Sequence, residues 1–149
     1  MTAPASWALI EAVAERMRAI KIVDGYHTDA GLDVITETVD HQDEPKAPQI
    51  TVFSDGSLVV KDETRKWTDI DVPIVIQLRI PISSRRAQRM AHEAAADILT
   101  ALNPRSGQIS VDEFKADIES TDIVPRPFGA AVIAVQVVLR ATLRIEKPV

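Results

Sequence analysis

The chain has 149 residues, of which 46% are hydrophobic, and it carries a net charge of −5. This size suits one well-buried domain and is short for two, so we expect a single domain over residues 1–149. No cysteine is present, which excludes disulfides, thiolate metal sites and cysteine nucleophiles. No apolar run approaches ~20 residues and no basic run exceeds Arg85-Arg86, so we expect neither a membrane span nor sequence-independent nucleic-acid binding.

The first half of the chain predicts one helix and several strands. Apolar residues at helical spacing indicate a helix over residues 4–22, ended by Asp24-Gly25. A short strand at 32–38 and a polar loop at 40–48 follow. The Ser54-Asp55-Gly56-Ser57 turn then predicts a hairpin between strands at 49–53 and 58–61. Residues 62–66 predict a second exposed turn.

Residues 68–82 predict an unusually long strand, because every even position from Ile70 to Ile82 is apolar. Pro73 and Pro81 share a parity, so one edge of this strand can be fully paired only over about residues 75–79, while the other can pair throughout. The overhang is either an opening for another subunit or an ordinary frayed end. The sequence leaves both interpretations open.

The second half predicts a helix over about 84–102, with Ser83 and Ser84 as N-caps and an alanine-rich buried stripe. Its expected outer face comprises Arg85, Arg86, Arg89, His92, Glu93 and Asp97. Strands follow at 118–124 and 130–145, and the latter is the natural partner of 68–82. We therefore predict an α+β fold, a mainly antiparallel sheet with two long strands and two helices packed on one face.

The other face of the two long strands mixes polar and aliphatic residues, a composition typical of a surface that meets a partner. It comprises Val75, Gln77, Arg79, Val132, Ala134, Gln136, Val138 and Arg140. Charge is also uneven, since residues 37–71 hold nine acidic and four basic residues, whereas Arg85, Arg86, Arg89, Arg140 and Arg144 lie elsewhere. Complementary patches on opposite sides would suit head-to-tail contacts in a ring. A normally mixed soluble surface is the alternative.

Motifs of catalysis are missing from the sequence. His92-Glu93 lacks the second histidine of a zinc helix, because Ala96 stands at that position. His41 lies among Asp40, Asp43 and Glu44, which leaves a weak divalent-cation site as one interpretation, although the spacing of a calcium loop is absent. Neither a phosphate-binding glycine loop nor a nucleophile elbow occurs. We expect no enzyme activity and no cofactor.

The order of elements and two local phrases carry a resemblance. Gly25-Tyr26-His27-Thr28 follows the first helix, and Ala47-Pro48-Gln49-Ile50-Thr51-Val52 precedes the turn at 54–57. Over about residues 10–145 the chain resembles the tail terminator proteins of long-tailed bacteriophages, also called minor tail or tail completion proteins. The resemblance implies a hexameric ring on the last ring of the tail tube, without catalytic residues, which stops tube polymerisation and presents a surface for head joining.

The implied partners are other copies of the chain, the tail tube protein and the head–tail connector protein, with no specific nucleic acid and no membrane. The implied location is the virion tail, and the host cytoplasm during assembly. Candidate interface residues fall in two loops and on the long strands: Asp40, His41, Asp43, Glu44, Lys46, Asp62, Glu63, Arg65, Lys66, Gln77, Arg79, Gln136 and Arg140. A head–tail joining or neck protein, a monomeric binding module and an enzyme remain as alternatives.

Overall fold

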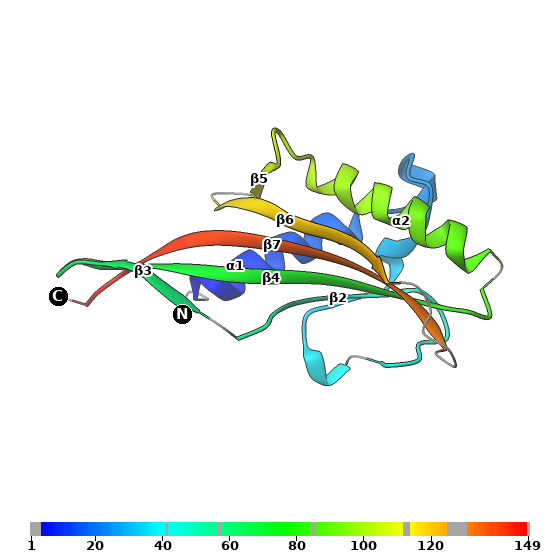
Figure 1. Cartoon of the computed structure of the whole chain (residues 1–149), viewed down its shortest axis with the longest axis horizontal. Coiled ribbons are helices and arrows are strands. Elements are labelled where there is room, and N and C mark those ends of the chain that lie inside the picture. Colours follow the sequence, from blue (N-terminus) through cyan, green and yellow to red (C-terminus); the bar gives the residue numbers. More distant parts are fainter. Residues whose placement is uncertain are drawn as a thin grey trace.

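Two α-helices lie on one face of a seven-stranded, mostly antiparallel sheet (Figure 1). The computed structural model describes residues 4–40, 42–56, 58–84, 86–111, 114–124 and 131–148. The helices are α1 (Ala5–Arg18) and α2 (Ala87–Leu102), and neither these nor the short turns described are long and apolar enough to cross a membrane. The predicted α+β class, with two helices and two long strands, is confirmed.

The sheet has the order β1-β2-β4-β7-β6-β5, with β3 also paired to β4. Its strands are β1 (Val34–Ile35), β2 (Gln49–Ser54), β3 (Val59–Glu63), β4 (Trp67–Pro81), β5 (Gln108–Val111), β6 (Phe114–Val124) and β7 (Val132–Glu146). β4 and β7 pair antiparallel from Trp67 opposite Glu146 to Pro81 opposite Val132. The predicted partnership of the two long strands is therefore confirmed along their whole length.

The predicted hairpin at residues 54–57 is wrong. β2 pairs with residues 74–79 of β4 and β3 pairs with residues 68–71, so both run along the same edge of β4 rather than against each other. Pro73 lies between these two stretches and Pro81 lies beyond β2, in line with the predicted limits of pairing on that edge. The chain's own β3 thus covers part of the expected overhang. The hairpin is instead at residues 64–66, where the Thr64 amide donates to the Trp67 carbonyl over 2.9 Å.

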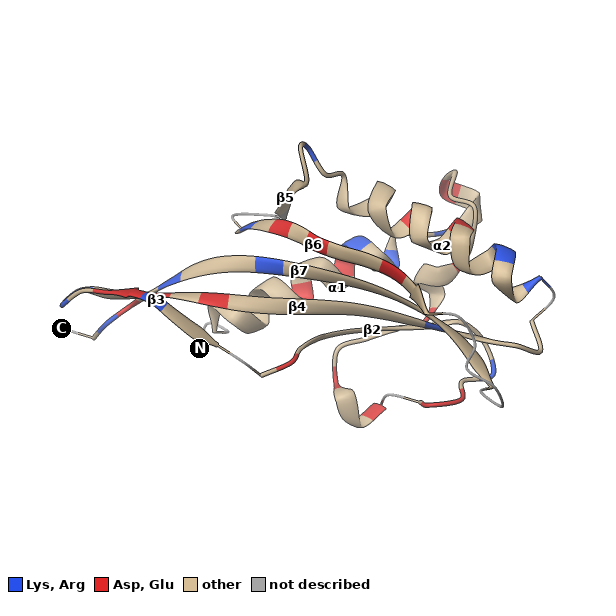
Figure 2. Cartoon of the chain, viewed as in Figure 1, with Lys and Arg blue, Asp and Glu red and all other residues tan. Residues whose placement is uncertain are grey.

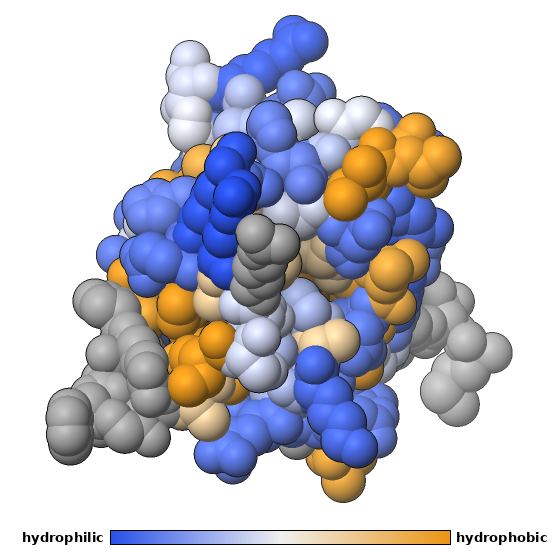
Figure 3. Space-filling view, turned by 90° about the vertical axis from the view of Figure 1, so that its right-hand side faces the viewer, coloured by the Kyte–Doolittle hydropathy of each residue, from blue (hydrophilic) through white to orange (hydrophobic). Residues whose placement is uncertain are grey.

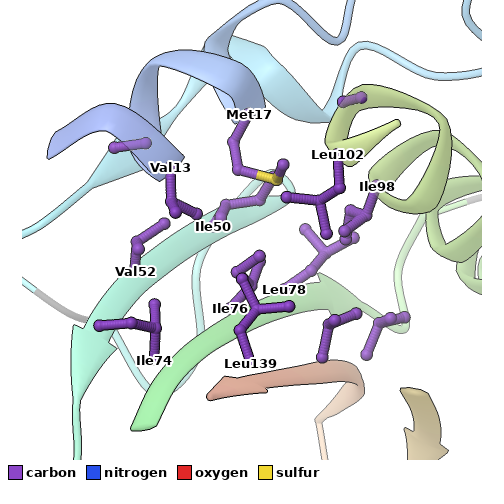
Figure 4. Packing of buried hydrophobic residues seen from close by; sticks show 14 of the residues in the cluster. Val13, Met17, Ile50, Val52, Ile74, Ile76, Leu78, Ile98, Leu102 and Leu139 are labelled. Atoms are coloured by element: carbon purple, nitrogen blue, oxygen red, sulfur yellow. The ribbon is translucent and has the colours of Figure 1, made fainter. Parts of the chain in front are cut away.

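The core lies between the helices and the even-numbered residues of β4. Val13 and Met17 of α1 and Ile98 and Leu102 of α2 are fully buried against Ile76 and its neighbours in the sheet (Figure 4). These side chains come from alternate positions on the strands and from i, i+4 positions on the helices, so one face of each element supplies the core.

Helix α1 is shorter than predicted, because a loop closes over its end. The Gly31 amide donates to the Ile20 carbonyl over 2.9 Å, and a Cβ on Gly31 would stand 2.5 Å from the Met17 carbonyl oxygen. Only glycine allows this approach. The predicted strand at 32–38 is reduced to β1, because residues 22–24 (η1), 30–32 (η2) and 38–40 (η3) form 3₁₀ turns.

Helix α2 begins at Ala87 rather than near residue 84. The Ser84 amide donates to the Pro81 carbonyl over 3.0 Å, which turns the chain out of the sheet before the helix begins. Arg86, in the left-handed conformation, occupies the N-cap position, and no described side chain caps the helix there. The predicted caps at Ser83 and Ser84 are therefore wrong, and Arg85 lies outside the described residues.

Candidate interaction surfaces

The face of the sheet away from the two helices, here called the open face, carries the residues predicted to meet a partner. Gln77 lies opposite Gln136, and on either side of this pair stand Thr51 of β2 and Asp122 of β6. The next row places Phe53, Val75 and Val138 side by side. Register thus brings the predicted pair Gln77 and Gln136 together in a surface whose rows alternate between polar and apolar.

Arg79 is not free on this face. Its Nη1 lies 3.3 Å from the Asp43 carbonyl oxygen and 3.4 Å from Oδ1 of the same residue. The contact ties the loop after η3 to the open face, and Pro45 in this loop is buried. The structure therefore joins Arg79 and Asp43, which the sequence placed at separate sites. Asp40, Glu44 and Lys46 are exposed, and His41 lies outside the described residues.

At the other end of the molecule, three strands extend past the helices. This arm comprises β3, residues 67–72 of β4 and residues 141–146 of β7, and the turn at 64–66 connects β3 to β4 at its tip (Figure 1). At its base Ile70, Val72, Ala141 and Leu143 are still buried in the core. Arg144 donates two hydrogen bonds to the Asp69 carboxylate, from Nε to Oδ1 over 2.8 Å and from Nη2 to Oδ2 over 3.0 Å. Its Cζ lies 4.3 Å from the centroid of the Trp67 ring. The hydrogen bond from Arg144 holds the pKa of Asp69 below its ordinary value, and the same contact raises the pKa of Arg144.

The predicted interface residues Glu63, Arg65 and Lys66 lie at the tip of the arm. Glu63 accepts a hydrogen bond from Lys147 over 2.7 Å, which lowers the pKa of the Glu63 carboxyl. Arg65 and Lys66 are exposed in the turn, and Asp62 is exposed beside them on β3. The tip therefore presents both signs of charge, with Arg65 and Lys66 at the turn and Lys61 on β3 as exposed cations.

A second set of ion pairs lies where the arm joins the rest of the sheet. Arg140 Nε contacts Glu119 Oε1 at 2.6 Å, and this hydrogen bond raises the pKa of Arg140. Its Nη1 lies 3.8 Å from Asp71, whose buried carboxylate also accepts the Thr142 hydroxyl over 2.7 Å. Arg140 and Arg144 thus neutralise carboxylates of their own chain (Figure 2). The predicted separation of acidic and arginine patches onto opposite sides is wrong for these two residues.

Two features escaped the sequence analysis. Asp97, expected on the outer face of α2, is buried and accepts three hydrogen bonds from His27 and Thr28. A groove of about 530 Å³ lies between the N-terminal half of α2, residues 22–33 and residues 47–48. Ile22, Val23 and Leu32 are exposed around it, and such apolar residues in a polar loop were the signal that could have revealed it.

No described cluster of three or more His, Asp or Glu residues could hold a metal ion. His92 is exposed on α2, and its neighbour Glu93 forms an ion pair with Arg89 at 2.7 Å. The interpretation of His41 as a cation ligand falls on a residue outside the described ranges.

Comparison with solved structures gives the fold a precedent. One chain of the virion of a native gene transfer agent particle superposes with a TM-score of 0.61 at 17% identity, over 97% of this chain and 100% of that one. The two chains share a fold. A second solved chain gives a TM-score of 0.48 at 17% identity, covering 98% of this chain and 100% of its own length. No family model matches the sequence, and no curated protein matches it.

Proposed function

We propose that the protein is a structural virion component that caps the tail tube as a ring, most simply a hexamer, ends tail polymerisation and offers a surface for head joining. The observation that carries the proposal is the fold shared with a virion chain over nearly the full length of both proteins. In this proposal the partners are further copies of the chain, the tail tube protein and the head–tail connector protein.

The composition of the open face supports an assembly role. Val75 is buried although it faces away from the helices, and Gln77, Gln136 and Val138 are half-buried around it. Protein interfaces combine such apolar centres with polar residues that hydrogen bond across the contact. We assign the subunit interface or the lumen of the ring to this face.

The first test is the mass of the purified protein in solution, measured by light scattering over a range of concentrations, with negative-stain microscopy of the same samples. We expect a closed ring. A strict monomer at high concentration would contradict the proposal and favour a monomeric binding module.

The second test is genetic. Disrupting the gene in the virus or phage-like particle that encodes it should give overlong tails without heads, and the wild-type gene supplied in trans should restore normal length. Tails of normal length that merely fail to attach to heads would identify a head–tail joining protein instead.

A further inference from the structure

The groove beside α2 is an apolar trough with charged walls. Leu78 and Ile80 of β4 lie at its base and are fully buried, so its accessible apolar surface comes from Ile22 and Leu32 on the loop side and from the half-buried Met90 on α2. Asp29 and Asp33 line the loop side, whereas Arg86 and Arg89 line the helix side. Seen from this end of the molecule, separate apolar patches interrupt a mainly hydrophilic surface (Figure 3). Such a groove suits an apolar segment that carries charges of both signs along its edges.

The arm supplies a segment of this kind. Val59 and Val60 at the start of β3, and Leu58 just before it, are each more than half exposed, and the outer edge of β3 has no strand beside it among the described residues. Exposed apolar side chains on an unpaired edge are a ready site for association with another chain. Arg65 and Lys66 lie at the adjoining turn, and Asp62 lies on the strand.

The arm and the groove lie at opposite ends of the long axis of the molecule (Figure 1). A subunit therefore cannot fill its own groove, but the arm of one subunit can reach the groove of another. Contact between two different patches is head-to-tail, and its repetition closes a ring when the rotation allows it.

Charge complementarity between the loop wall and the 64–66 turn favours the arm as the occupant of the groove. Residues 22–45, which form the loop wall of the groove and continue beyond it, hold seven Asp or Glu residues and no Lys or Arg. The turn at 64–66 holds Arg65 and Lys66 and no acid.

We propose that the arm of one subunit docks in the groove of the next, so that Val60, which lies on the helix-side face of β3, packs against the exposed apolar residues Ile22 and Leu32 of the groove and the 64–66 turn contacts the acidic loop. This inference rests on the proposed ring, to which it assigns a specific subunit contact.

The absence of native cysteine allows a direct test in the full-length protein. Val60→Cys on the arm and Leu32→Cys at the groove both replace exposed residues. A disulfide forms only when two Cα atoms come within about 7 Å. After mild oxidation, we expect the double variant to give a ladder of covalent oligomers on a denaturing gel, whereas each single variant gives none.

The matched control combines Val60→Cys with Lys115→Cys, an exposed position on β6 that does not line the groove. This pair should give no ladder. The ring itself is measured separately by light scattering without oxidation. Rings that form without the Val60–Leu32 ladder, or with an equal ladder in the control, would overturn the arm–groove contact alone. A wild-type protein that stays monomeric would overturn both this contact and the proposed function.

A charge exchange tests the same contact without cysteine. Arg65→Glu with Lys66→Glu should weaken ring formation at least ~10-fold, because it places like charges against the acidic loop. Rings of unchanged stability in this variant would contradict the contact.

Discussion

The carboxylate of Asp97 accepts both the amide and the hydroxyl of Thr28, over 2.8 and 2.7 Å, across 69 residues of sequence. The same carboxylate accepts the His27 amide over 3.0 Å. Asp97 is only 1% exposed, so these hydrogen bonds are shielded from water and hold the loop after α1 against α2. This loop forms one wall of the groove beside α2. The hydrogen bonds of Asp97 therefore hold that wall in position against the helix.

We expect Asp97→Ala to lower the free energy of unfolding by ~2–3 kcal/mol, because two backbone amides would lose their acceptor in a buried site. Thr28→Val removes only the hydroxyl donor and should cost about 1 kcal/mol. Urea denaturation of each variant measures both values. Glu93→Ala on the same helix is the control, with an expected change within about 0.5 kcal/mol. Equal losses in Asp97→Ala and Glu93→Ala would contradict the anchoring role.

The sequence predicts those parts of the fold that leave a periodic pattern along the chain. It does not predict those that are decided by pairing with residues far away in the sequence. The alternation along β4 and β7 predicted two long paired strands, because a side-chain period of two allows only one face to meet the core. The turn at 54–57 has a strong local hairpin signal, yet β4 is long enough to pair with β2 and β3 in succession. Tertiary pairing therefore overrode the local preference.

The candidate surfaces were less predictable for the same reason. Asp97 resembles any polar residue on a solvent-facing position until its partners at 27 and 28 are known. Arg140 and Arg144 looked like part of a basic patch because the sequence does not show that the register puts Arg144 directly opposite Asp69. By contrast, Gln77 and Gln136 lie on strands whose faces were correctly assigned, and the structure places them opposite each other.

The ion pair between Arg144 and Asp69 predicts a pH dependence of the arm. The pKa of Asp69 is lower in the folded protein than in the unfolded chain, as is that of Glu63. The stability from these carboxylates is therefore present above the ordinary carboxyl pKa range and is lost as the pH falls through the lowered values. In Arg144→Gln, we expect the pKa of Asp69 to rise to its ordinary range, as measured by NMR titration of the side-chain carboxyl carbon.

Arg89→Gln is the control for this titration, because it breaks the Arg89–Glu93 pair on α2 and leaves the arm intact. The pKa of Asp69 should not change in this variant. An Asp69 carboxyl whose pKa is equally low with and without Arg144 would show that the ion pair is absent in solution.

Two isoleucines on one face of the sheet should differ sharply in their contribution to stability. Ile76 is fully buried beneath the helices, whereas Ile145 in the arm is 45% exposed. We expect Ile76→Ala to cost ~2–5 kcal/mol, because it opens a cavity in the core, and Ile145→Ala to stay within about 1 kcal/mol. Urea denaturation under conditions that keep the protein monomeric measures both. Similar costs at the two positions would mean that the arm is packed as tightly as the core.

A charge at the centre of the open face should separate folding from assembly. Gln77 is directly flanked by the neutral residues Thr51 and Gln136, so Gln77→Glu should change the free energy of unfolding by less than about 1 kcal/mol. If this face meets another subunit, the new carboxylate is desolvated there, which costs several kcal/mol. At ~1.4 kcal/mol for each factor of ten, we expect self-association to weaken at least ~100-fold.

Gln88→Glu, at an exposed position of α2, makes the same chemical change outside the open face and should leave association unaltered. Sedimentation analysis of the two variants decides the matter: equal association constants would remove the open face from the interface.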